Sequence, residues 1–156
     1  MNATTPLPDW QVSTWLNSET HLSLHELQGN VVMIHSFQML CPGCVQHAIP
    51  QAERVHRLYA GKGLVVIGLH TVFEHHEVMT EAALRAFLYE NRITHPVGID
   101  QADSVSAVPK TMRDYGMQGT PSLLLVDHTG RLRVHEFGQI DDLRLGMWLG
   151  QLLAQA

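Results

Sequence analysis

Short, nearly continuous apolar runs alternate along the chain with segments whose apolar residues recur every three or four positions. The runs indicate buried strands, and the three-and-four spacing indicates helices packed by one face. We predict strands over 10–15, 31–37, 64–69, 96–99, 122–126 and 131–137. We predict helices over 24–28, 45–59, 80–91, 109–115 and 141–153.

Local signals refine this pattern. Ser23 and Glu26 have capping-box spacing, which predicts that the short helix over 24–28 begins there. Pro50 lacks an N–H and should kink the helix over 45–59. Residues 127–130 separate two predicted strands and favour a hairpin.

The order of these elements predicts an α/β fold. Strands and helices alternate first, and a hairpin and a last helix follow, which is typical of a central mixed β-sheet flanked by helices. The strand over 10–15 adds an N-terminal β extension. We expect residues 1–8 to be a flexible N-terminus and residues 9–156 to form a single domain, in keeping with the length of 156 residues.

Composition narrows the function classes. The chain has 10 Lys and Arg against 15 Asp and Glu, a net charge of -5, and no basic run, which argues against a nucleic-acid partner. No apolar stretch approaches the roughly 18 residues that suggest a membrane span. The first basic residue is Arg54, so no positively charged segment precedes an apolar one as in a secretory signal, and we expect a cytoplasmic protein.

The chain contains two cysteines, Cys41 and Cys44, in a C-x-x-C arrangement. A lone pair of this kind provides only half the ligands of a four-coordinate zinc site. Disulfides in a reducing compartment are mostly transient and catalytic. The pair follows a predicted buried strand and precedes a predicted helix, which favours redox chemistry.

Three segments, 31–37, Cys41-Pro-Gly-Cys44 and 119–130, together resemble the thioredoxin superfamily, and within it the TlpA-like or redoxin (AhpC/TSA-type) thiol-disulfide oxidoreductases. The resemblance implies a thioredoxin-like fold and no cofactor other than a redox-active Cys41–Cys44 disulfide. It also implies protein or small-molecule disulfides as partners, and another reductase that recycles the protein.

The placement of the pair suggests a role for each cysteine. Cys41 should lie where a helix begins, and the free N–H groups and the helix dipole there favour a thiolate. We therefore expect Cys41 to be the nucleophile and Cys44 to resolve the mixed disulfide. Pro42 and Gly43 should set the turn and the reduction potential. Their order is the reverse of that in the reducing thioredoxins, which leaves the direction of electron flow open.

Thr120-Pro121 looks like the cis-proline site of the superfamily, opposite the cysteines. A cis bond there would expose the backbone of Thr120 to an extended substrate, so both residues are candidate substrate-binding residues. Proline reaches the cis form at a cost of only about 0.5–1 kcal/mol. The alternative is an ordinary trans proline that begins a strand.

Two histidines are candidates for proton transfer or tuning of the cysteines. His35 lies six residues before Cys41, where thioredoxins carry a buried acid, and could exchange a proton near neutral pH or be only a core histidine. His47 would share a helix face with Cys44, or be only an exposed histidine. His70, His75 and His76 have poor chelate spacing, so we expect no metal. Six more histidines carry no pattern: His21, His25, His56, His95, His128 and His135.

Two other functions and one assembly stay open. A peroxiredoxin-like thiol peroxidase would need a threonine three residues before the nucleophile, where this chain has Gln38. A metal-binding redox chaperone is less favoured, because related proteins of that kind use C-x-x-x-C.

Leu40 stands where TlpA-like proteins have tryptophan, which could change the docking of partners. A homodimer would cover the apolar residues of the last helix, but burial in the core explains them as well.

Overall fold

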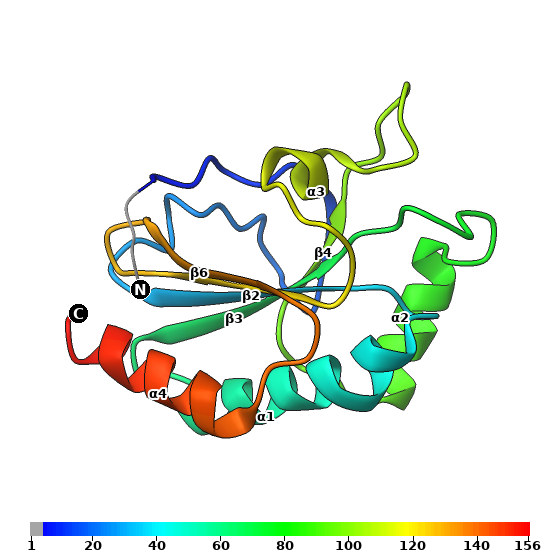
Figure 1. Ribbon diagram of the computed structural model, residues 1–156. Helices are drawn as coiled ribbons and strands as arrows, with labels where there is room; N and C mark the ends of the chain where they lie inside the picture. The colour runs from blue at the N-terminus through cyan, green and yellow to red at the C-terminus, as the bar shows by residue number, and fades with distance from the viewer. Residues whose placement is uncertain (1–4) are drawn as a thin grey trace.

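The computed structural model, which describes residues 5–156, contains a six-stranded mixed sheet with helices on both faces (Figure 1). The strands are β1 Val12–Leu16, β2 Val31–Phe37, β3 Leu64–His70, β4 Val97–Asp100, β5 Ser122–Val126 and β6 Leu132–Phe137. The helices are a π-turn η1 Cys44–Ala48, α1 Ile49–Tyr59, α2 Glu81–Glu90, α3 Lys110–Asp114 and α4 Asp142–Leu153. The predicted α/β class and mixed sheet are confirmed.

The sheet has the strand order β1-β4-β3-β2-β5-β6, so β2 lies in its interior. β2 pairs in parallel with β3 and antiparallel with β5. All seven residues of β2 are buried, as its continuous apolar run predicts. The cysteine segment therefore follows the C-terminal end of a central strand that is buried on both faces.

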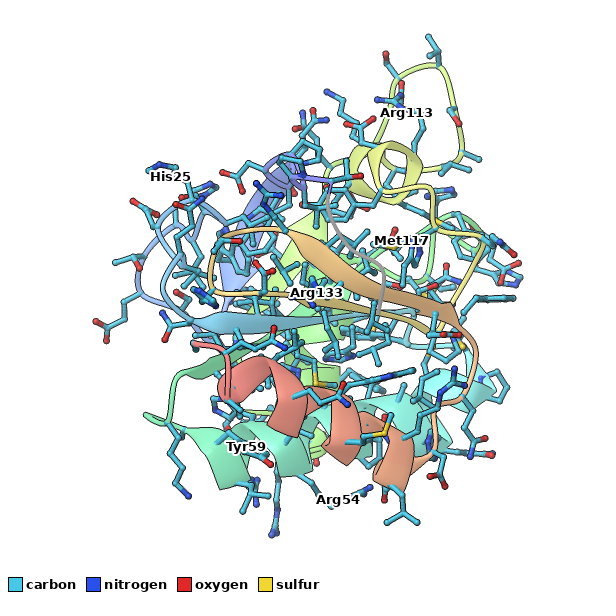
Figure 2. The ribbon with its side chains drawn as sticks, turned by 60° about the vertical axis from the view of Figure 1, so that its left-hand side comes forward. His25, Arg54, Tyr59, Arg113, Met117 and Arg133 are labelled. Carbon is cyan, nitrogen blue, oxygen red and sulfur yellow. The ribbon has the colours of Figure 1, made fainter. Side chains whose placement is uncertain are left out.

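The two faces of the sheet bury separate sets of side chains. On one face, α1 and α4 cover Val31, Met33 and Leu125, and α2 packs beside them against Phe37. On the other face, α3 and the segment before β2 cover Val32, Ile34 and Leu124. Figure 2 shows labelled residues of α1 on one side of the sheet and Arg113 and Met117 on the other.

The predicted helix over 24–28 is wrong, because residues 24–29 form hydrogen-bonded turns. Ser23 acts as the spacing suggests, since its Oγ accepts from the N–H of Glu26 at 3.2 Å. Gly29 follows at once with φ +95°, outside the helical region. The segment between them is too short to repay the cost of starting a helix.

Where a kink is predicted at Pro50, the structure instead has a π-helical segment just before it, η1 Cys44–Ala48. The N–H of Ile49 bonds to the carbonyl of Cys44, five residues back, and α1 begins at Ile49. Pro50 has no N–H to continue an i to i-4 ladder, so the turn before it is free to widen. The helical segment after Cys41 thus has two parts, and the wide part carries Cys44.

The N-terminal segment lies against the β5–β6 hairpin where it is described. The N–H of Leu7 donates to the carbonyl of Gly130 at 3.3 Å, and Pro6 forms an isolated bridge with Arg131. Part of the segment predicted to be flexible is therefore held by hydrogen bonds, and residues 1–4 of it lie outside the described residues. No helix within residues 5–156 has the length and apolar character needed to cross a membrane.

Candidate active site

The two cysteines lie directly after β2, at the start of the helical segment. Cys41 is partly exposed and Cys44 is fully buried, and both thiols are free. The backbone N–H of Cys44 donates to Sγ of Cys41 across 3.3 Å. A hydrogen bond of this kind stabilises a negative sulfur, so the geometry favours a thiolate at the accessible cysteine.

Residues 120 and 121 lie opposite the cysteines. Sγ of Cys41 is 3.5 Å from the carbonyl oxygen of Thr120, to which its S–H can donate. The Thr120–Pro121 peptide bond is cis. The Cδ atom of Pro121 stands 3.6 Å from the position of a Cβ built on Gly43. The structure therefore brings together the segments 41–44 and 120–121, which are far apart in the sequence.

Cys44 has the properties of a thiol that stays protonated. Burial, with a further contribution from its hydrogen bond to Cys41, raises the pKa of Cys44 to about 12. At neutral pH its sulfur is therefore a poor nucleophile unless a base removes the proton.

His35 lies on β2, is buried, and its ring stacks on that of Phe37 with the centroids 5.4 Å apart. Burial, and then the charge of His95, hold the pKa of His35 well below its ordinary value, although Glu53 opposes this. His35 is therefore neutral at physiological pH, and its low pKa makes it a weak proton acceptor.

His47 and the other candidate histidines are arranged differently. The Nε2 atom of His47 lies 2.9 Å from the carbonyl oxygen of Ile140, to which it donates. His70 is buried at the end of β3, and burial lowers its pKa to about 4. His75 and His76 are exposed on the following loop. Within residues 5–156, no three of the His, Cys, Asp and Glu side chains form a group that could hold a metal ion.

Two residues of this region carry no signal in the sequence pattern, Glu53 and His95. Glu53 on α1 forms an ion pair with Arg57 four residues later, a spacing typical of exposed helix faces, yet Glu53 is buried. His95, in the loop before β4, is fully buried. The Nδ1 atom of His95 lies 2.7 Å from Oε2 of Glu53. The contact between Glu53 and His95 depends on the packing of α1 against this loop, so the sequence pattern does not predict it.

Comparison with known proteins agrees with the fold. The profile of the redoxin family matches residues 2–142 of the chain. The chain belongs to the redoxin family. The fold is thioredoxin-like.

Two solved structures are similar over almost the whole chain. A protein of the thioredoxin-like superfamily has 50% sequence identity and a TM-score of 0.95, with 98% of this chain and 99% of that chain covered. A thiol-disulfide isomerase from Corynebacterium glutamicum has 48% identity and a TM-score of 0.93, with 97% of each chain covered.

Curated relatives are much longer proteins. NHL repeat-containing protein 2 of Gallus gallus is 37% identical over 92 residues, which are 58% of this chain and 12% of that protein. Protein DipZ of Mycobacterium bovis is 30% identical over 133 residues, which are 83% of this chain and 18% of that protein. The chain thus spans less than a fifth of the length of these two relatives.

Proposed function

We propose that this protein exchanges dithiol and disulfide with protein disulfides, using Cys41 as the nucleophile and Cys44 as the resolving thiol. The observation that carries the proposal is the contrast between the two sulfurs. Cys41 is accessible and accepts a hydrogen bond from the N–H of Cys44, whereas Cys44 is buried with a raised pKa. The partly exposed sulfur is suited to attack, and the buried sulfur to closing the ring.

The reaction has two steps. The Cys41 thiolate attacks one sulfur of the substrate disulfide, a mixed disulfide forms, and the other substrate sulfur leaves as a thiolate. Cys44 loses its proton to a base and attacks Sγ of Cys41, which forms the Cys41–Cys44 disulfide and releases the second substrate thiolate. The substrate is reduced by two electrons and the protein is oxidised by two. A second thiol reductase would restore the dithiol, and the reverse sequence would oxidise a partner.

The segment 120–121 would hold the substrate during these steps. The Thr120 carbonyl faces Sγ of Cys41, so an extended chain lying along residues 119–121 would bring its own disulfide to the reacting sulfur. This placement supports Thr120 and Pro121 as substrate-binding residues. The name of the Corynebacterium relative, a thiol-disulfide isomerase, supports protein disulfides as substrates.

A pair of cysteine variants tests the proposal. Cys41→Ser should abolish the reduction of insulin disulfides, because no sulfur remains that can attack. Cys44→Ser should retain attack and accumulate a mixed disulfide, detected by mass spectrometry of the intact protein. If the Cys41→Ser protein reduces insulin as fast as wild type, the proposed mechanism is wrong.

A further inference from the structure

We propose that a cavity between α2 and the end of β1 binds a small organic carboxylate, with Arg85 and Arg92 at the charged group and an apolar floor under the rest of the molecule. This site goes beyond the thiol chemistry of the protein. The cavity has a volume of about 450 Å³, within the range of small-molecule sites. None of its lining residues belongs to segments 41–44 or 119–121, so the site is separate from the cysteines.

The floor of the cavity is apolar. It is formed by Leu16 at the end of β1, Leu88 on α2 and Ile93 directly after that helix. All three side chains are buried and belong to one core cluster. Because closely packed interiors resist collapse, these residues present a preformed apolar surface to a ligand.

The rim of the cavity is positively charged. Its charged lining residues are Arg85 and Arg92, and among the described residues no Asp or Glu lines it. The other polar lining residues are uncharged, namely Asn17, Tyr89 and Thr94. The rim thus differs in sign from the whole chain, whose net charge is -5. A positive rim above an apolar floor is complementary to an anion that has an apolar body.

Arg92 occupies a backbone position that favours glycine. Its N–H donates to the carbonyl of Tyr89 at 3.1 Å, and the N–H of Ile93 donates to the carbonyl of Leu88 at 2.9 Å. These two bonds end α2 in a Schellman motif, which needs a left-handed residue where Arg92 stands, and its φ is +55°. Glycine adopts this conformation freely, whereas a residue with a Cβ is strained in it. A strained residue at the rim of a cavity indicates a functional constraint.

The guanidinium of Arg92 is available to a ligand. The backbone carbonyl of Arg92 accepts from Nη2 of Arg57 at 3.2 Å, so the main chain is held on both sides of the residue. Among the contacts of residues 5–156, the side chain of Arg92 has no ion pair and no hydrogen bond, and the residue is exposed. Its planar group of N–H donors can therefore bind a carboxylate in bidentate fashion.

Arg85 is held by a neighbour on its own helix. Its Nε and Nη2 both donate to Oε1 of Glu81, at 3.0 and 2.7 Å, which leaves Nη1 for another acceptor. Glu81 offsets much of the charge of Arg85, so the rim has little more than one net positive charge. The C-terminal end of α2 adds a partial negative charge. A carboxylate, with its single charge, therefore suits this rim better than a phosphate dianion.

Isothermal titration calorimetry with 2-naphthoate tests the site. Wild type should bind 2-naphthoate. The neutral 2-naphthamide, which has the same rings, should bind about tenfold more weakly or worse, because it lacks the charge that the arginines recognise. Cys41→Ser should bind 2-naphthoate as wild type does, since the cavity does not include the cysteines. Equal affinity for the acid and the amide, or no binding of the acid at about 1 mM, would overturn the proposal.

Arg92→Gly separates binding from folding. Glycine relieves the strained position, so the urea midpoint should not fall, whereas the affinity for 2-naphthoate should fall about tenfold or more. Arg92→Lys keeps a positive charge at the end of α2 but loses the planar group, so it should weaken binding several-fold. The matched control is Arg131→Ala, because Arg131 is exposed and does not line the cavity. This control should bind 2-naphthoate as wild type does.

Amide resonances in NMR spectra locate the bound acid. Addition of 2-naphthoate should shift the resonances of residues 16–17 and 85–94 more than those of residues 41–44. Larger shifts elsewhere, or an unchanged affinity in Arg92→Gly, would overturn the site. If Arg92→Gly does lower the urea midpoint, Arg85→Gln supplies the same comparison, and wild-type affinity in that variant would also overturn it. The insulin assay tests the proposed function separately, so either conclusion can fail while the other stands.

Discussion

Gly43 and Pro121 face each other across the active site: a Cβ built on Gly43 would stand 3.6 Å from Cδ of Pro121. This distance is an ordinary van der Waals contact, and Gly43 has helical backbone angles, φ -64° and ψ -31°. Glycine is therefore not required here by backbone strain. Its absent side chain instead leaves open the space between the two halves of the site.

Substitutions at Gly43 should consequently affect exchange more than folding. Gly43→Ala should change the free energy of unfolding by no more than about 1 kcal/mol, the difference between the two residues in a helix. Gly43→Leu should also fold, because the position is exposed, but the added atoms should crowd Pro121 and slow insulin reduction several-fold. Urea denaturation and the insulin assay measure the two effects. A Leu variant as fast as wild type would show that this space is not used.

Gly98 in β4 has a steric role of a different kind. A Cβ there would stand 2.8 Å from Cγ2 of Val12 in β1, and both residues are buried. Gly98→Ala should therefore lower the free energy of unfolding by about 1–3 kcal/mol, the usual cost of overpacking. The control is Gly150→Ala in α4, where a Cβ meets nothing within 4 Å. That change should stabilise the protein slightly, because alanine is the better helix former. Equal unfolding midpoints for the two variants would contradict this account.

His70 should make the protein less stable in acid. Burial lowers the pKa of His70 from 6.5 to about 4. Between these two pH values His70 is protonated in the unfolded chain and neutral in the folded chain. The stability that this histidine contributes is complete above pH 6.5 and is lost as the pH falls toward 4. At pH 5 the loss amounts to about 2 kcal/mol.

The measurement is urea unfolding of wild type and His70→Gln at pH 7.5 and pH 5. Whatever the substitution costs at a single pH, the difference in unfolding free energy between the two pH values should shrink by about 2 kcal/mol. His76→Gln, on the exposed loop that follows β3, is the matched control and should keep the wild-type difference. An unchanged pH difference in His70→Gln would refute the assignment.

Local patterns predict most of this fold because they act within a few residues. The apolar run of β2 and the spacing of Leu145, Trp148, Leu149 and Leu152 in α4 reflect burial that each element must achieve. The Cys41–Cys44 spacing is local in the same way. The capping-box pattern at Ser23 shows where local patterns fail. The predicted contact between Ser23 and Glu26 forms, but Gly29 follows after too few residues for a helix, so the segment forms turns.

The contacts of Glu53 and His95 could not be predicted in this way. The two residues are 42 positions apart, and each resembles a common surface residue in its own segment. Glu53 in particular lies four residues before Arg57, the spacing of a solvated helix pair. Their burial depends on how α1 packs against the loop before β4, and no short-range pattern encodes that arrangement.

The contrast between the two thiols should be visible in alkylation. Cys44 is fully buried, and its raised pKa of about 12 keeps it protonated at neutral pH, so iodoacetamide should modify Cys41 and leave Cys44 intact. In Cys41→Ser, Cys44 should stay almost unreactive at pH 7.5 and react only when urea unfolds the chain. Mass spectrometry of the intact protein counts the added groups, and Cys44→Ser is the control that should still accept one. Rapid modification of Cys44 in the folded Cys41→Ser protein would mean that its sulfur is neither shielded nor held as a thiol, and the need for a base in the second step would disappear.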